Sequence, residues 1–147
     1  MKKLCAGLAL ILTMAVTAAA AGEEEDVSQA VLAAQSWLAI VDAGKFDESW
    51  ERAATTFQKG ITKAKWQQAV GNVRTPIGAV KSRILMAGGG ALKVVKLAVG
   101  DAVVIQFATS FEKFAPAIET VTPFREQDGS WKVSGYFIKP ASPAEMK

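Results

Sequence analysis

The spacing of apolar residues changes midway along the chain, and this change restricts the folds that the chain can adopt. Between residues 27 and 73, apolar residues recur every three or four positions, which is the period of a helix with one buried face. From residue 80 to residue 138 they alternate with polar residues, as in half-buried strands. Helices followed by consecutive strands indicate an α+β domain with its helices on one face of an antiparallel sheet.

The first half of the chain is expected to form three helices. The first is capped by Asp26 and ends at Gly44. The second starts near Asp47, and the third is capped by Thr62 and ends at Gly78.

The second half is expected to form a curved antiparallel sheet of four to five strands. Gly88, Gly89 and Gly90 favour one turn, and Asp128 with Gly129 forms a strong hairpin signal. The alternating segments lie at residues 80–86, 91–99, 102–111, 117–125 and 131–138.

Residues 1–21 have the pattern of a secretory signal peptide. Lys2 and Lys3 precede a short apolar segment, and small residues at 18–21 fit a cleavage site. The only cysteine, Cys5, precedes the apolar segment, so it is not placed for lipid attachment. We therefore expect a periplasmic or secreted protein that meets the membrane only during export.

The rest of the chain is expected to hold one domain. Residues 22–27 form an acidic flexible N-terminus, residues 28–139 the single α+β domain, and residues 140–147 a flexible tail. The leader carries Lys2 and Lys3, so the formal net charge of +3 falls to about +1 without it. This charge does not favour a nucleic-acid partner.

Several stretches resemble one known group of domains. AAQSWLAIVDAGKFDESWERAA is similar to the opening helices of nuclear transport factor 2-like (cystatin-like) domains, and DGSWKVSGYFI to their final hairpin. RTPIGAVKSR and IETVTPF narrow the resemblance to the domain of unknown function 4019 family, over about residues 27–139. The resemblance implies a small exported bacterial protein whose sheet folds over its helices into a cone with a pocket. It implies no activity, because enzymes and binders share this fold.

The residues favour a non-catalytic protein, without a cofactor or a metal site. Histidine is absent, and Tyr136 alternates with Val133 and Phe137, so it is expected to point away from their face. Glu119 fits an exposed strand carboxylate paired with a lysine, and Asp42 fits a turn-stabilising residue. The alternative is an isomerase-like or dehydratase-like enzyme that uses Glu119 or Asp42 as its acid or base in the cone pocket.

Aromatic and hydroxyl side chains provide the remaining candidates for a binding site. They suit a pocket for a lipophilic small molecule, and the alternative is that the tryptophans fill the core. The expected lining residues are Trp37, Trp66, Phe107, Thr109, Thr120, Thr122, Phe124, Trp131 and Phe137. The outer sheet face carries Val104, Gln106, Ala108 and Tyr136, none of which is charged. Such a face suits a homodimer interface, which the superfamily resemblance also implies.

Overall fold

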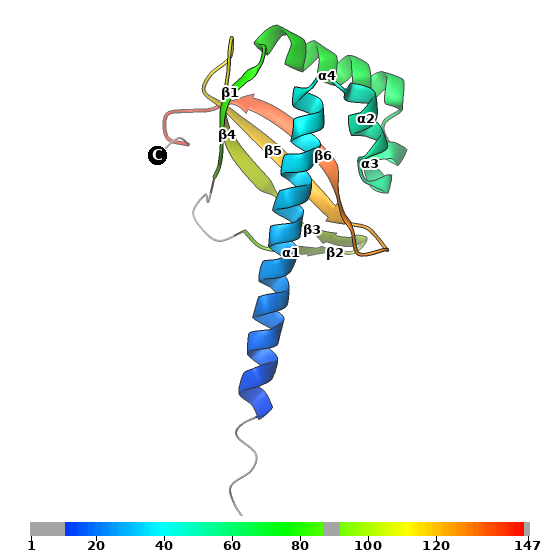
Figure 1. Ribbon diagram of the computed structural model, residues 1–147, viewed down its shortest axis with the longest axis vertical. Coiled ribbons are helices and arrows are strands. Elements are labelled where there is room, and N and C mark those ends of the chain that lie inside the picture. The colour runs from blue at the N-terminus through cyan, green and yellow to red at the C-terminus, as the bar shows by residue number, and fades with distance from the viewer. Residues whose placement is uncertain (1–10, 87–91, 146–147) are drawn as a thin grey trace, which may run out of the picture.

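The chain folds into a layer of helices packed against one antiparallel sheet (Figure 1). The computed structural model describes residues 11–86 and 92–145, and the expected turn at Gly88–Gly90 lies outside them. The helices are α1 (Ile11–Asp42), α2 (Phe46–Glu51), α3 (Thr55–Gly60) and α4 (Lys63–Ile77). The strands are β1 (Val80–Leu85), β2 (Val95–Leu97), β3 (Gly100–Ala102), β4 (Ile105–Phe111), β5 (Ala117–Arg125) and β6 (Trp131–Pro140). The expected α+β class is therefore confirmed.

The described residues form four helices instead of the expected three. Thr62 caps α4 as expected, since its Oγ1 accepts the backbone N–H of Lys65 at 3.3 Å. Gly44 follows the end of α1 with a φ of 73°, a conformation that glycine adopts without strain. Asp26, however, lies inside α1 and does not begin it. The short α3 was not expected, because none of its six residues is buried and its sequence therefore has no apolar stripe.

The N-terminal part of α1 extends away from the sheet (Figure 1). Residues 18–25 are all exposed, and from residue 18 onward the first buried side chain of the helix is that of Ala30. In the part of the chain that the structure covers, no helix combines the length and the hydropathy needed to cross a membrane.

The sheet has six strands, with β5 at its centre. Its strand order is β1-β4-β5-β3-β2, and β6 pairs with β5. The expected strand 102–111 is divided, because Ala102 ends β3, which pairs with β2 and β5, whereas Ile105 begins β4, which pairs with β1 and β5. Glu119 of β5 lies beside Phe107 of β4 and Ile138 of β6, which places it in the middle of the sheet.

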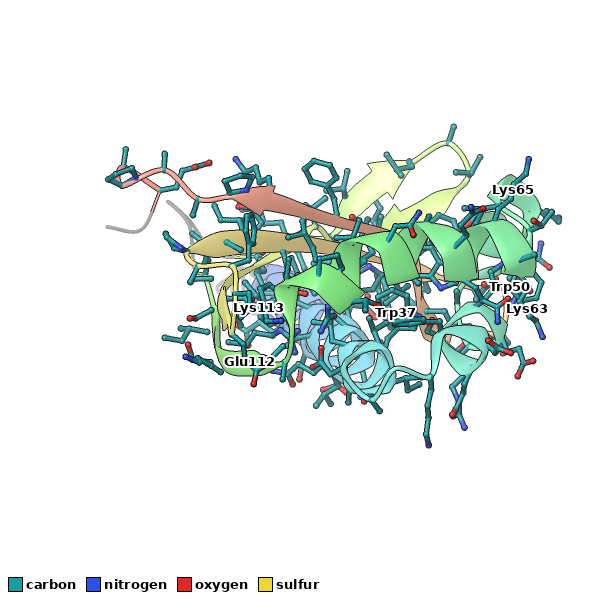
Figure 2. All side chains as sticks on the ribbon, turned by 90° about the horizontal axis from the view of Figure 1, so that it is seen from above. Trp37, Trp50, Lys63, Lys65, Glu112 and Lys113 are labelled. Atoms are coloured by element: carbon teal, nitrogen blue, oxygen red, sulfur yellow. The ribbon has the colours of Figure 1, made fainter. Side chains whose placement is uncertain are left out.

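The main core lies between the helices and one face of the sheet, as Figure 2 shows from above. Alternate residues of β4 are buried, and those between them are half-buried. The core residues are Ala30, Ala34, Trp37, Leu38, Val41, Trp66, Val70, Val103, Ile105, Phe107, Val121 and Val133. The opposite face, here called the outer sheet face, is not covered by any helix of the described residues, and it exposes Ile84, Val104 and Phe137.

A bulge in β6 reverses the expected orientation of Tyr136. Thr122 pairs with Gly135 and Pro123 with Val133, so Ser134 has no partner on β5, and its hydroxyl donates to the Thr122 carbonyl at 2.9 Å. The extra residue shifts the alternation, and Tyr136 consequently packs in the same core as Val133. The expectation that Tyr136 points away from the face of Val133 was therefore wrong.

Candidate functional site

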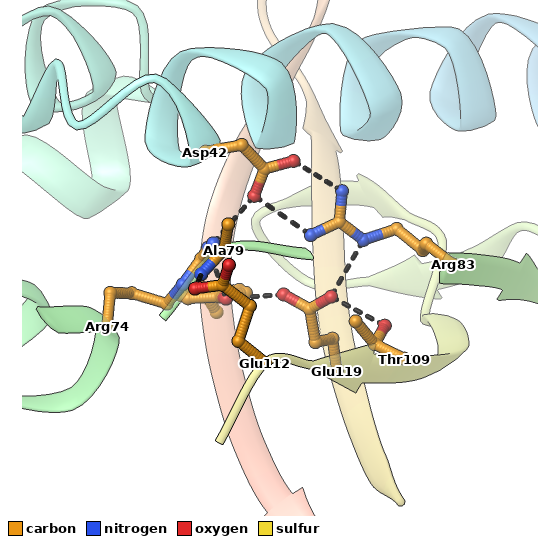
Figure 3. Close-up of polar contacts among 8 residues, drawn as sticks. Asp42, Arg74, Ala79, Arg83, Thr109, Glu112 and Glu119 are labelled. Carbon is orange, nitrogen blue, oxygen red and sulfur yellow. Dashed lines mark hydrogen bonds and ion pairs between the residues drawn. The ribbon is translucent and has the colours of Figure 1, made fainter. Parts of the chain in front are cut away.

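A network of charged and hydroxyl side chains lies between the end of α1 and the centre of the sheet (Figure 3). Each member comes from a different element, so the network forms only in the complete fold. Its members are Asp42 of α1, Arg74 of α4, Arg83 of β1, Thr109 of β4, Glu119 of β5 and Tyr136 of β6.

Asp42 accepts hydrogen bonds from two arginines. Its Oδ1 lies 2.8 Å from Nη2 of Arg74 and 3.0 Å from Nη2 of Arg83, and its Oδ2 lies 2.6 Å from Nη1 of Arg83. The two-point contact with Arg83 is the geometry in which arginine and a carboxylate bind most specifically. Asp42 is therefore held by ion pairs rather than serving only to stabilise the turn before Gly44.

Glu119 is fully buried, with 0% of its surface exposed. Its Oε1 accepts from Nε of Arg83 at 2.7 Å and from the Thr109 hydroxyl at 2.6 Å. Its Oε2 accepts from the Tyr136 hydroxyl at 2.5 Å. The expectation of an exposed carboxylate paired with a lysine was wrong, because Glu119 faces the core and the helices cover it.

The two arginines are held just as firmly. Arg74 is only 6% exposed, and its guanidinium lies 5.0 Å from the centre of the Phe111 ring. Its Nη1 donates to the Tyr136 hydroxyl at 3.3 Å, while its Nε is buried without a partner among the described residues. The negative charges of the two carboxylates thus offset the positive charges of the two guanidiniums in a confined volume.

This environment fixes the protonation states of the network. Burial alone would raise the pKa of Asp42, but hydrogen bonds from Arg83 and Arg74 outweigh it and hold that pKa below its ordinary value of 3.8. Burial, together with the neighbouring Glu119 charge, raises the pKa of Tyr136 despite the opposing Arg74 charge. Burial would lower the pKa of Arg83, but its contacts with Asp42 and Glu119 raise it. At neutral pH the phenol remains protonated and Asp42 remains ionised.

The arrangement favours a structural network over an acid–base catalyst. A catalytic carboxylate needs a pKa tuned toward the working pH, whereas the pKa of Asp42 moves in the opposite direction. The Glu119 oxygens are both occupied by donors of the protein itself. Among the described residues, no group of His, Cys, Asp and Glu side chains has the arrangement of a metal site.

Aromatic side chains pack beside this network and fill the space under the helices. Trp37 lies 5.3 Å from the Tyr136 ring and 5.8 Å from Trp66, measured between ring centroids. Both indoles bind Ser49, since Trp37 donates to its carbonyl at 2.8 Å and Trp66 to its hydroxyl at 2.9 Å. Phe57 meets Trp66 edge to face at 4.9 Å.

The nine residues expected to line one pocket lie in several places. Trp37, Trp66, Phe107 and Thr109 lie on the core side of the sheet. Thr120 faces the opposite side, where Gln106 donates to it at 3.4 Å, and Thr122 follows the same alternation. Phe137 is 62% exposed on that face.

The two remaining candidates line surface hollows. Trp131, with Trp37, lines a slot of about 360 Å³ between α1, α2 and β6. Phe124 packs with Ala54 and Ala102 outside the main core and lines a larger cavity near the same end of β5. The lipophilic ligand expected from the sequence stays a prediction.

Arg74 and Arg83 were missed as site residues. A signal for Arg74 exists in the sequence, because it continues the buried stripe of Trp66 and Val70 at intervals of four residues. Arg83 has no such signal, since alternating strands normally place arginine in solvent. Its role depends on Asp42 and Glu119, which lie about 40 residues away on either side.

The fold and the network define an α+β domain whose central charges are bound to one another. Residues 33–136 match the family model described as Protein of unknown function (DUF4019). The chain therefore belongs to this family. No curated protein and no solved structure matches it.

Proposed function

We propose that the protein is an exported, non-catalytic interaction module of the cell envelope, which forms a homodimer through its outer sheet face. The observation that carries this proposal is the exposure of large apolar side chains on that face. Ile84 is 66% exposed and Phe137 62%, and Val104 is also exposed. These side chains share one face of the sheet, spread over β1, β6 and the residue before β4, and an exposed apolar face of this kind typically marks an interaction site.

A second copy is the partner that this face fits best. Gln106, Ala108 and Thr120 lie between the exposed apolar residues and carry no charge, whereas Lys139, beside the buried Ile118, is paired with Glu145. A two-fold interface brings each patch against its own copy, so a charged residue near the axis would meet the same charge. Uncharged side chains avoid this repulsion, and the charge of Lys139 is balanced within each copy by Glu145.

The paired network and the filled core support the non-catalytic part of the proposal. Trp37 and Trp66 occupy the space under the helices, and the arginines neutralise Asp42 and Glu119. We also propose, on the sequence resemblance, that the sheet is the curved sheet of a nuclear transport factor 2-like cone. In such a cone the side chains named here occupy the interior, which leaves the outer face for recognition.

The proposal of export depends on the signal-peptide pattern at residues 1–21. Residues 18–25 are exposed and the buried part of α1 starts at Ala30, so cleavage near residue 21 removes no described core contact. The family match likewise begins later, at residue 33. The intact mass of protein recovered from the periplasm or the medium reports the cleavage point.

The dimer is tested by sedimentation equilibrium of the mature protein over a range of concentrations. We expect a monomer–dimer equilibrium in the wild type. Phe137→Glu buries a charge in the interface, so it should raise the dimer Kd by at least about 30-fold, a loss of about 2 kcal/mol. Leu32→Glu is the matched control, because Leu32 is 54% exposed on α1, away from the sheet face.

Two results would count against the proposal. One is a wild-type protein that remains monomeric at the highest concentration reached. The other is a dimer that Leu32→Glu disrupts as strongly as Phe137→Glu, since the contact would then lie elsewhere. Circular dichroism of both variants establishes that each remains folded.

A further inference from the structure

A cavity of about 750 Å³ lies at one end of the sheet, where α3, the β2–β3 turn and the β5–β6 hairpin meet (Figure 1). It is separate from the Asp42–Glu119 network and from the residues of the proposed dimer face. Its size falls within the range of pockets that hold small organic molecules. Three segments distant in sequence contribute to it: residues 55–59, 99–101 and 124–132.

The acidic side chains of this cavity each have one oxygen bound to the protein. Oδ2 of Asp101 pairs with Lys96 at 2.6 Å, and Oε1 of Glu126 accepts the Thr55 backbone N–H at 2.6 Å. Oδ1 of Asp128 accepts from the backbone and the hydroxyl of Ser130. The second oxygen of each carboxylate makes no hydrogen bond to the described residues. Three oriented acceptors are therefore available for hydroxyl groups of a ligand.

The basic side chains of the cavity differ from one another in whether they have an ion-pair partner. Lys59 and Lys132 line the cavity without an ion-pair partner among the residues that the structure covers. Arg125, in contrast, is paired with Asp26 at 3.1 Å and lies over the Trp131 ring. The two lysines are thus the charges still available to an incoming anion.

The remaining lining adds further polar groups and an apolar surface. Thr55, Thr56 and Gln127 bring hydroxyl and amide groups. Phe124 lies under the cavity with only 8% of its surface exposed, and Gly100 lies so close to its ring that an added Cβ would be 2.6 Å from Cζ. The glycine therefore lets the β2–β3 turn close over Phe124.

We infer that this cavity binds a sugar that carries a carboxylate or a phosphate. The free carboxylate oxygens accept its hydroxyls, the threonines and the glutamine donate to its ring and hydroxyl oxygens, and the two lysines bind its anionic group. The site is independent of the proposed dimer, so failure of either proposal leaves the other standing.

The test is a titration of the mature protein followed by ¹H–¹⁵N NMR spectra. The probes are D-glucuronate and glucose 6-phosphate, with glucose as the neutral sugar and inorganic phosphate as the anion without a sugar. We expect both anionic sugars to shift the amide signals of residues 55–59, 99–101 and 124–132. Glucose and phosphate should each bind at least about tenfold more weakly.

Variants then establish whether the lysines act as inferred. The double variant Lys59→Ala with Lys132→Ala should weaken binding of the anionic sugars at least about tenfold. Lys65→Ala is the matched control, because Lys65 is exposed on α4 and does not line the cavity. Lys59, Lys65 and Lys132 are all exposed. The NMR spectra of the variants without ligand report whether each variant keeps its fold.

Several outcomes would overturn the inference. They are no shift with either anionic sugar at about 10 mM, shifts confined to other parts of the chain, and equal binding by the lysine double variant. Equal affinity for glucose would remove the requirement for an anion, and equal affinity for phosphate the requirement for a sugar. Glucuronate binding without glucose 6-phosphate binding, or the reverse, identifies which anionic group the site accepts and supports the inference.

Discussion

Removing the Arg83 guanidinium should destabilise the fold strongly, because Arg83 is the only described cation in contact with the fully buried Glu119. Arg83→Met keeps an unbranched side chain of similar length but removes the charge. The variant loses three hydrogen bonds of 2.6–3.0 Å, two to Asp42 and one to Glu119. Asp42 still has Arg74, so most of the loss comes from Glu119. Removing one partner of a buried pair typically costs about 3–5 kcal/mol, and we expect a loss in this range.

Urea unfolding monitored by tryptophan fluorescence measures this loss, because Trp37 and Trp66 lie in the core beside the network. Arg52→Met is the matched control, since Arg52 also pairs with a glutamate, at 2.9 Å, but on the surface. An exposed pair of this kind is worth less than about 1 kcal/mol. The double variant Arg83→Met with Glu119→Gln should recover part of the loss, because the amide keeps partners in Thr109 and Tyr136 and carries no charge.

The reasoning would be refuted if Arg83→Met cost no more than Arg52→Met. It would also be refuted if Glu119→Gln added its full separate cost to that of Arg83→Met. In the first case the buried carboxylate would not depend on the guanidinium. In the second case the two residues would not be energetically coupled.

Two further predictions concern Asp42 and the turn after α4. The folded pKa of Asp42 lies below 3.8, so its carboxylate stabilises the fold above about pH 4, and this stabilisation is lost as the pH falls through the folded pKa. Asp42→Asn should therefore lower the free energy of unfolding at pH 7, and acid titration of both proteins should show the difference shrinking toward about pH 2; a constant difference would contradict this. Gly78→Ala places a Cβ 2.6 Å from Oε2 of Glu112 at a φ of 78°, whereas Gly129→Ala, with a φ of 84°, meets no atom within 4 Å. Gly78 also has a ψ of −165°, a region that only glycine adopts readily, so thermal unfolding should show a larger loss for Gly78→Ala than the about 1–2 kcal/mol of an ordinary left-handed residue, and equal losses in the two variants would contradict this.

Local signals in the sequence predicted much of the fold. Thr62 and Gly44 act on backbone groups a few residues away, so the end of α1 and the start of α4 follow from short stretches of sequence. The alternation of β4 also predicts its buried face, because the pattern continues through the strand without interruption. These features support the α+β class without any long-range information.

The candidate site depended on information that no short stretch contains. A serine such as Ser134 does not by itself indicate a bulge. The bulge nevertheless turns Tyr136 toward the core. Glu119 looks like an exposed strand carboxylate until Arg83 is brought beside it from 36 residues away. Only the register of β4, β5 and β6 places Thr109 and Tyr136 around the same carboxylate.

The network that joins six elements also has a consequence for how the chain folds. Glu119 and Arg74 leave water only when the helices close over the sheet, and each then requires a counter-charge from another element. A form with α1 or β1 detached would hold a buried ion whose partner is missing, so such forms have high free energy. The helical half and the sheet should therefore unfold in a single cooperative step, and the charges at the centre of the domain act against partly folded intermediates.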